Sequence, residues 1–111
     1  MEQAGYRGIT IAREVYVGYK DLPPFNKDLH YKMLEMEREE ELVSISHQRQ
    51  VLTLLCDQFG SQDIGCWLEA AKLEVETGHP LEGAKLLARG EGSVGQEMRE
   101  KFAVLREQMG V

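Results

Sequence analysis

The stretch that decides the fold runs from residue 63 to residue 80 and reads DIGCWLEAAKLEVETGHP. Its apolar residues return every three or four positions, which is the spacing of one face of an α-helix: Ile64, Trp67, Leu68, Ala71 and Val75. Asp63 precedes the first of them as a candidate N-cap, and Gly78 follows the last. Pro80 suits the first turn of a second helix, where its missing N–H costs nothing. The stretch therefore predicts a helix, a tight turn and another helix.

Similar stripes recur on both sides of this stretch. Apolar residues at helical spacing predict five helices besides the one at 64–75, around residues 12–19, 29–36, 51–59, 81–88 and 98–109, and the helix around 81–88 is the one that Pro80 begins. The stripe of the first of these five includes Val15, and that of the helix around 81–88 includes Leu81. No segment alternates with a period of two for long enough to predict a strand. We therefore expect an all-α chain whose short connections make neighbouring helices antiparallel.

Serines and glycines mark the expected ends of these helices. Either Ser44 or Ser46 is expected to cap the helix around 51–59. Gly60 is expected to end that helix as a C′ residue. Gly90 and Gly92 are expected to break the helix around 81–88 and to form a loop.

Composition excludes several classes of function. The chain has 111 residues, enough for one domain, and 13 Lys and Arg against 19 Asp and Glu give a net charge of -6. An acidic chain without clustered cations argues against a general nucleic-acid-coating protein. No apolar run approaches the ~20 residues of a membrane span, so no membrane partner is expected. Cys56 and Cys66 lie among apolar residues on expected helices, which favours buried free thiols, although one disulfide is possible by count.

The chain also repeats itself. The odd helices align at a step of 36, with Arg13-Glu14-Val15, Arg49-Gln50-Val51 and Lys85-Leu86-Leu87 in equivalent places. The even helices align at a step of 37, with Met36-Glu37 matching Leu73-Glu74. Two helices per period of about 36 residues predict antiparallel helical hairpins stacked as a short α-solenoid. The competing interpretation is that amphipathic helices can be slid into register by chance.

The repeated units resemble half-a-TPR (HAT) repeats, which occur in RNA-processing assemblies. Their first helix carries Trp followed seven residues later by Glu, as Trp67 and Glu74 do here. Their second helix carries Ala-Arg, then an aliphatic and an aromatic residue, as in Ala12-Arg13-Glu14-Val15-Tyr16. The resulting set of structural repeat residues is Ala12, Arg13, Val15, Tyr16, Glu37, Arg49, Val51, Trp67, Glu74, Ala84 and Leu87.

The first part of the chain is similar to a more specific family. The segments GYRGITIAREVY at 5–16 and YKDLPP at 19–24 resemble the C-terminal part of the U3 small nucleolar RNA-associated protein 6 family, which are HAT-repeat subunits of the small-subunit processome. There are departures, since His30 stands where the repeat has its aromatic residue and Ala88 replaces the aromatic that Tyr16 supplies. Family members are several times longer. We therefore expect residues 1–111 to form a single domain of about two and a half repeats, a fragment or short form of a longer array.

The resemblance implies a non-catalytic scaffold. It implies a place in the nucleus and nucleolus, with other processome and U3 snoRNP proteins as partners and a role in 18S rRNA maturation. The residues agree with the absence of catalysis: His30, His47 and His79 lie in different segments, and none has a metal-ligand spacing with Cys56 or Cys66. No cofactor, metal or small-molecule substrate is expected. Association with snoRNA is expected to be indirect, because five cations in residues 1–32 are nearly balanced by four acids.

An acidic run is the candidate partner surface. Glu35, Glu39, Glu40 and Glu41 surround a single Arg38 and could dock a basic partner, although a solvated helix face is the simpler interpretation. Glu37 differs from the other acids of the run, because it is the repeat equivalent of Glu74. Both are expected to pair with a cation on an adjoining helix, such as Arg49 or Lys85.

The alternative function is a generic TPR-like adaptor of the co-chaperone type. Such an adaptor would bind a peptide terminus through clustered Lys and Arg, and no helix face carries that cluster.

Overall fold

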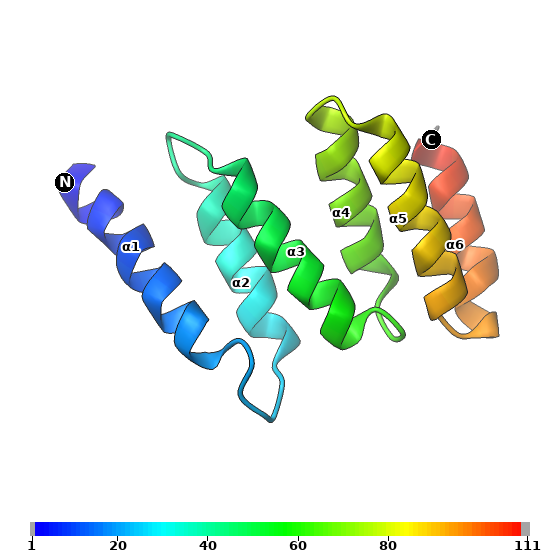
Figure 1. Ribbon diagram of the computed structural model, residues 1–111, viewed down its shortest axis with the longest axis horizontal. Helices are drawn as coiled ribbons and strands as arrows, with labels where there is room; N and C mark the ends of the chain where they lie inside the picture. The colour runs from blue at the N-terminus through cyan, green and yellow to red at the C-terminus, as the bar shows by residue number, and fades with distance from the viewer. Residues whose placement is uncertain (1, 110–111) are drawn as a thin grey trace. The chain divides into compact units, whose positions relative to one another are not determined.

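The computed structural model describes the backbone of residues 2–109 and the side chains of residues 8–109. Over these residues the chain is all-α, without strands, and its six helices are drawn in Figure 1: α1 (Glu2–Tyr19), α2 (Lys27–Arg38), α3 (Ile45–Phe59), α4 (Ile64–Glu76), α5 (Pro80–Ser93) and α6 (Gln96–Met109). Within the first unit α1 and α2 pair as an antiparallel hairpin, and within the second unit α4 pairs with α5 and α5 with α6. The all-α class, built from helical hairpins, is as predicted.

The chain divides into two compact units, Met1–Val51 and Leu52–Val111. The boundary falls inside α3, so neither of the two parts corresponds to a whole number of hairpins. Each unit has its own buried side chains. The expectation of a single domain stays a prediction.

The first unit is centred on the hairpin of α1 and α2. Asn26 caps α2 by accepting a hydrogen bond from the backbone N–H of Asp28 at 2.9 Å. The two helices bury one side of each against the other, and their buried side chains are Ile9, Tyr16, His30, Met33, Leu34 and Glu37. Three of these six are titratable, Tyr16 on α1 and His30 and Glu37 on α2, so the core of this hairpin is partly polar.

Ser44, and not Ser46, caps α3. The Ser44 hydroxyl accepts a hydrogen bond from the backbone N–H of His47 at 3.3 Å and also hydrogen-bonds His47 Nδ1 at 2.6 Å. The backbone carbonyl of Ser44 accepts the first helical bond, from Gln48 N. This is the N-cap geometry expected for a serine directly before a helix.

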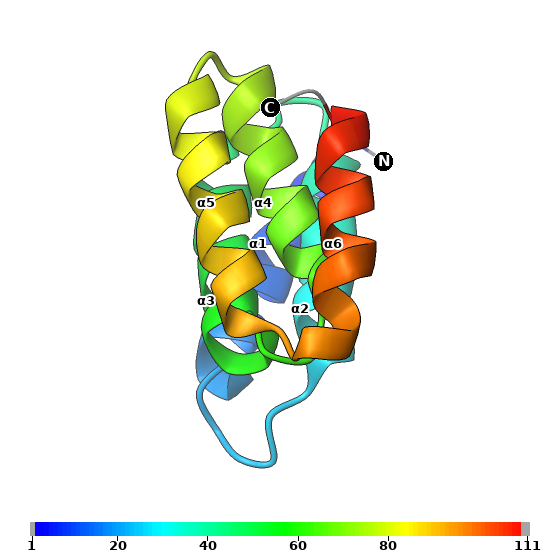
Figure 2. The same ribbon diagram turned by 90° about the vertical axis from the view of Figure 1, so that its right-hand side faces the viewer.

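The second unit contains three helices that pack on one another. Figure 2 shows α4, α5 and α6 side by side, and each of the three contacts the other two. Asp63 caps α4 through the backbone N–H of Gly65, as predicted. Gly78 ends α4 with a φ of 88°, and His79 N donates to Glu74 O at 2.7 Å, which is the Schellman arrangement.

The expected break at Gly90 and Gly92 is wrong, because α5 continues to Ser93. Gly90 lies inside the helix and is buried against two aromatic side chains. A Cβ on Gly90 would lie 2.6 Å from Trp67 Cγ and 2.7 Å from Phe102 Cζ. The glycine is there because α4 and α6 approach the α5 backbone closely, and its helix propensity is overridden by that packing.

The apolar stripe expected for α5 is also partly wrong. Leu87 is fully buried and Ala84 half-buried, but Leu81 is exposed. The face of α5 that is buried follows Gly83, Leu87 and Gly90, at positions i, i+4 and i+7. Gly83 and Gly90 have no apolar side chain, so the pattern of apolar residues does not predict their burial, although they make the closest contacts with the neighbouring helices.

We expect Gly90→Ala to lower the free energy of unfolding by about 1–2 kcal/mol, because the steric cost of overpacking exceeds the gain in helix propensity. Gly92→Ala is the matched control, since it lies in the same helix and a Cβ there meets nothing within 4 Å. That variant should gain up to about 1 kcal/mol. Urea unfolding followed by far-UV circular dichroism measures both, and equal signs for the two variants would contradict the packing described here.

Among the described residues, none of the helices combines the length and the apolar character that a membrane crossing requires.

Candidate interaction site

Arg13 and Glu37 form a two-pronged ion pair between α1 and α2. Arg13 Nε donates to Glu37 Oε2 at 2.7 Å, and Arg13 Nη2 donates to Glu37 Oε1 at 2.7 Å. The Glu37 side chain is 1% exposed and that of Arg13 is 29% exposed. Parallel N–H···O bonds from one guanidinium to one carboxylate fix both distance and orientation. The pair therefore sets how the two helices meet, and both of its residues belong to the set of structural repeat residues.

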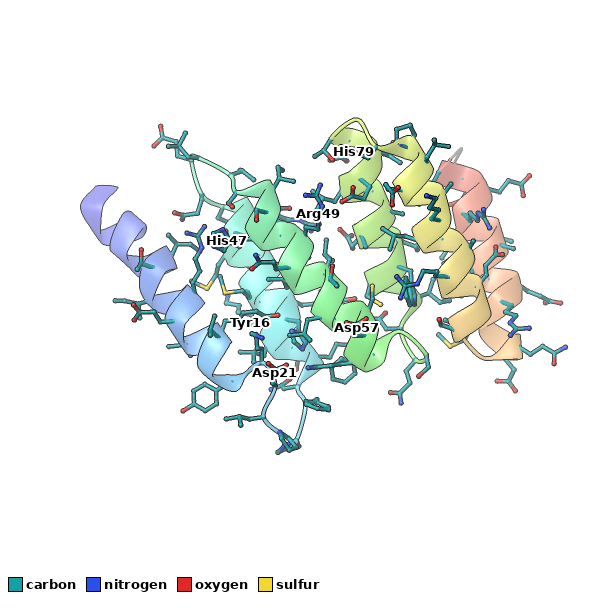
Figure 3. All side chains as sticks on the ribbon, in the orientation of Figure 1. Tyr16, Asp21, His47, Arg49, Asp57 and His79 are labelled. Atoms are coloured by element: carbon teal, nitrogen blue, oxygen red, sulfur yellow. The ribbon has the colours of Figure 1, made fainter. Side chains whose placement is uncertain are left out.

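The partner of Glu37 differs from the two cations named from the sequence. Its bidentate partner is Arg13 on the preceding helix, whereas Lys85 forms an exposed pair with Glu82 on its own helix at 3.4 Å. Glu74, the repeat counterpart of Glu37, is also buried, and its Oε2 lies 3.7 Å from Nδ1 of His79. Arg49 is exposed on α3, and Figure 3 labels its side chain.

Tyr16 and His30 form a second buried contact in the same hairpin. The Tyr16 hydroxyl and His30 Nδ1 are hydrogen-bonded at 2.8 Å, and the rings meet edge to face with centroids 5.5 Å apart. Burial, and then the nearby charge of Asp21, raise the pKa of the Tyr16 phenol. Figure 3 labels Tyr16 and Asp21 near the same end of this hairpin. The histidine thus fills the site of the expected aromatic residue and adds a polar bond.

Trp67 is buried in the second unit, as predicted, between two glycines. Its indole N–H donates to the Gly60 carbonyl at 2.8 Å, and a Cβ on Gly60 would lie 2.6 Å from Trp67 Cζ2. A Cβ on Gly90 would lie 2.6 Å from Cγ of the same indole, and the Arg89 guanidinium lies 5.5 Å from the ring centroid. Gly60 does not adopt the left-handed conformation of a C′ residue. It is glycine because the indole packs on its backbone.

Cys56 and Cys66 are both buried free thiols, as predicted. The Cys66 thiol donates to the Asp63 carbonyl at 3.1 Å. A hydrogen bond with Cys66, together with burial, raises the pKa of the Cys56 thiol. A thiol held protonated in this way is a poor nucleophile, and within the described residues no group of three or more His, Cys, Asp or Glu side chains could hold a metal ion.

The acidic run is divided by the end of α2. Glu35 lies on the helix and its Oε1 is 3.8 Å from Lys32 Nζ, whereas Glu39, Glu40 and Glu41 follow the last helical residue, Arg38. Glu39 and Glu41 are exposed and Glu40 is half-buried. Glu37 faces the other way, into the hairpin. The surface that could meet a basic partner is therefore the turn after α2 rather than a helix face.

A shallow groove of about 420 Å³ lies between α4 and α6 in the second unit. Its apolar lining is Leu68, Val75, Leu105 and Met109, with Glu69, Lys72 and Glu76 among its polar residues. Lys72 is the single cation among the lining residues, and its ammonium lies 3.9 Å from Glu76. The groove lacks the clustered Lys and Arg with which a co-chaperone adaptor would bind a peptide carboxylate.

No protein-family model matches the chain, and a search of curated proteins finds no match either.

Proposed function

We propose that the chain is a non-catalytic protein-interaction module of the HAT-repeat kind. Its setting in this proposal is the nucleolar U3 snoRNP and small-subunit processome, where it supports 18S rRNA maturation as a scaffold. The observation that carries the proposal is the bidentate pair of Arg13 and Glu37. It joins the Ala-Arg motif of one repeat helix to the buried Glu of the next helix, at the positions on which the resemblance rests.

The proposed partners are basic protein segments. The turn after α2 presents Glu39 and Glu41 to solvent beside the half-buried Glu40, and the chain as a whole carries a net charge of -6. The negative net charge of the chain repels the negative phosphate backbone of RNA. Phosphate-driven affinity scales with the number of cations that the protein engages. Contact with snoRNA is therefore indirect in this proposal, and proteins carry the attachment.

The test is a pull-down of pre-ribosomal particles from nuclear extract with the tagged chain, with and without nuclease. We expect capture to survive nuclease and to fall several-fold when Glu39, Glu40 and Glu41 are changed to Lys, because opposite charges steer association. The matched control changes the exposed Glu97, Glu100 and Glu107 of α6 to Lys, which alters the net charge equally at another place.

Three results would contradict the proposal. Capture lost after nuclease, or tight binding of the purified chain to naked RNA with a steep salt dependence, would make RNA the partner. An equal loss in both triple variants would mean that net charge, and not the turn after α2, decides the association.

A further inference from the structure

The connection between α2 and α3 is open, whereas its repeat counterpart between α4 and α5 is closed. The open connection covers residues 39–44, and Figure 1 shows it as a loop that extends past the end of α2. The counterpart covers residues 77–79, and the backbone N–H of each of its residues donates to a carbonyl near the end of α4. The repeat step is 37 at Glu37 and 36 at Arg49, so the open connection has an inserted residue. Insertions into one unit of a repeat lie in loops and often serve binding.

The backbone of residues 40–43 takes part in no hydrogen bond of the fold. Among residues 8–109, no N–H or C=O group in this stretch bonds another protein group. The stretch is bounded on one side by Glu39, whose N–H donates to Glu35 O at 3.2 Å, and on the other by Ser44, which caps α3. Peptide groups that the fold does not engage can bond a partner, and extended segments are recognised in this way through their main chain.

The same stretch carries two apolar side chains that the fold does not bury. Leu42 is 88% exposed, the highest value among the large apolar residues in the described part of the chain, and Val43 is also exposed. A single exposed leucine is common on protein surfaces. Here the leucine stands on a backbone that is itself unengaged, so the side chain and the main chain are both available to one partner. That combination suits insertion into a pocket rather than packing on a flat face.

Charge on the loop identifies the class of partner. Glu39, Glu40 and Glu41 directly precede Leu42, and the first and last of them are exposed. Within the described residues none of these carboxylates forms an ion pair. They would repel the phosphates of RNA or of an anionic membrane, whereas Lys and Arg side chains would pair with them. The loop therefore fits a protein surface that is basic around an apolar pocket.

A second copy of the chain does not offer such a surface in its groove between α4 and α6. That groove has an apolar lining, but Glu69 and Glu76 border it. Lys72 is the one cation among its described lining residues, and its ammonium already lies 3.9 Å from Glu76. Two copies with a net charge of -6 each would also repel one another. The complementary charge has to come from a different, basic protein.

We propose that residues 39–43 form a docking segment that inserts Leu42 into an apolar pocket of a protein partner. Lys or Arg residues at the rim of that pocket pair with Glu39 and Glu41, and peptide groups of residues 40–43 supply main-chain hydrogen bonds. This inference rests on the proposed function, because it states how a basic partner is held at the turn after α2. It adds an apolar anchor, so the carboxylates alone do not account for the attachment.

The first test compares two leucine variants of the full chain in the capture of pre-ribosomal particles. Leu42→Ser should weaken capture by about tenfold at unchanged net charge, because the buried area of the anchor is lost. Leu81→Ser is the matched control, since Leu81 is 76% exposed on α5, and it should leave capture unchanged. Neither variant should alter the urea unfolding curve, because neither side chain is in the core.

The outcomes separate this inference from the proposed function. If the triple change of Glu39, Glu40 and Glu41 to Lys lowers capture but Leu42→Ser does not, the proposed function stands and the docking segment is overturned. Equal losses in Leu42→Ser and Leu81→Ser would also overturn the docking segment. If neither the triple change nor Leu42→Ser lowers capture, both proposals fail.

The second test identifies what Leu42 touches. A photo-reactive benzoylphenylalanine replaces Leu42 in the full chain, or Leu81 in the control, and cross-linked peptides in the captured particles are identified by mass spectrometry. We expect position 42 to cross-link to a protein surface where apolar residues lie beside Lys or Arg. Cross-links to RNA, to another copy of the chain or to an acidic surface would overturn the inference. A yield no higher than that of position 81 would overturn it as well.

Discussion

Replacing Trp67 with alanine should lower the free energy of unfolding by about 3–5 kcal/mol. The indole is buried between Gly60 and Gly90, and no smaller side chain fills the space that its removal leaves. The backbone around it is held in helices, so collapse into the cavity is limited. The Gly60 carbonyl also loses the N–H that donates to it at 2.8 Å.

Urea unfolding followed by circular dichroism measures this change. Tyr19→Ala is the control, because Tyr19 is an aromatic residue that is 61% exposed, and its removal should alter the free energy of unfolding by less than about 0.5 kcal/mol. Trp67→Phe keeps an aromatic ring in the core but removes the indole N–H. It should therefore lower the free energy of unfolding by about 1 kcal/mol, for the hydrogen bond alone. A change below about half a kcal/mol in Trp67→Ala would show that the indole is not part of the core.

Arg13→Met should lower the free energy of unfolding by about 3 kcal/mol. The variant leaves the Glu37 carboxylate buried without its bidentate partner, and an unpaired buried charge costs about 3–5 kcal/mol. The lower end applies because Arg13 is partly exposed and water can reach its side of the pair. The double variant Arg13→Met, Glu37→Leu removes both charges and should recover most of the loss.

A double-mutant cycle between Arg13 and Glu37 measures the coupling directly. Lys32→Met is the control, because it breaks an exposed pair with Glu35 in the same hairpin and should cost at most about 1 kcal/mol. If Arg13→Met cost no more than Lys32→Met, the pair would be a surface contact and could not set the geometry of the hairpin.

Both effects concern residues that the repeat pattern singled out, but for reasons that the pattern could not supply. The spacing of Trp67 and Glu74 predicted one helix, and the burial of both side chains is observed. The alignment of Arg13 with Arg49 and Lys85 predicted equivalent helices. It did not identify which cation faces Glu37, because salt-bridge partners on different helices depend on how the helices cross rather than on their spacing in the chain.

The amino-acid sequence by itself determined the number of helices, both ends of α4 and the antiparallel order within the hairpins. Local rules suffice for these features: apolar residues at a period of 3.6, Asp63 as the N-cap of α4, and Gly78 at the end of α4. Short connections between helices leave little freedom other than a hairpin.

Only the tertiary structure decided the roles of Gly60, Gly90 and His30. Each looks like a helix break or a departure from the repeat when propensity is considered alone. The glycines lie where a neighbouring aromatic side chain approaches the backbone, and His30 lies where the Tyr16 hydroxyl needs a partner. Such choices depend on atoms that are distant in the chain, and packing and hydrogen-bond satisfaction then outweigh the local preference of the residue.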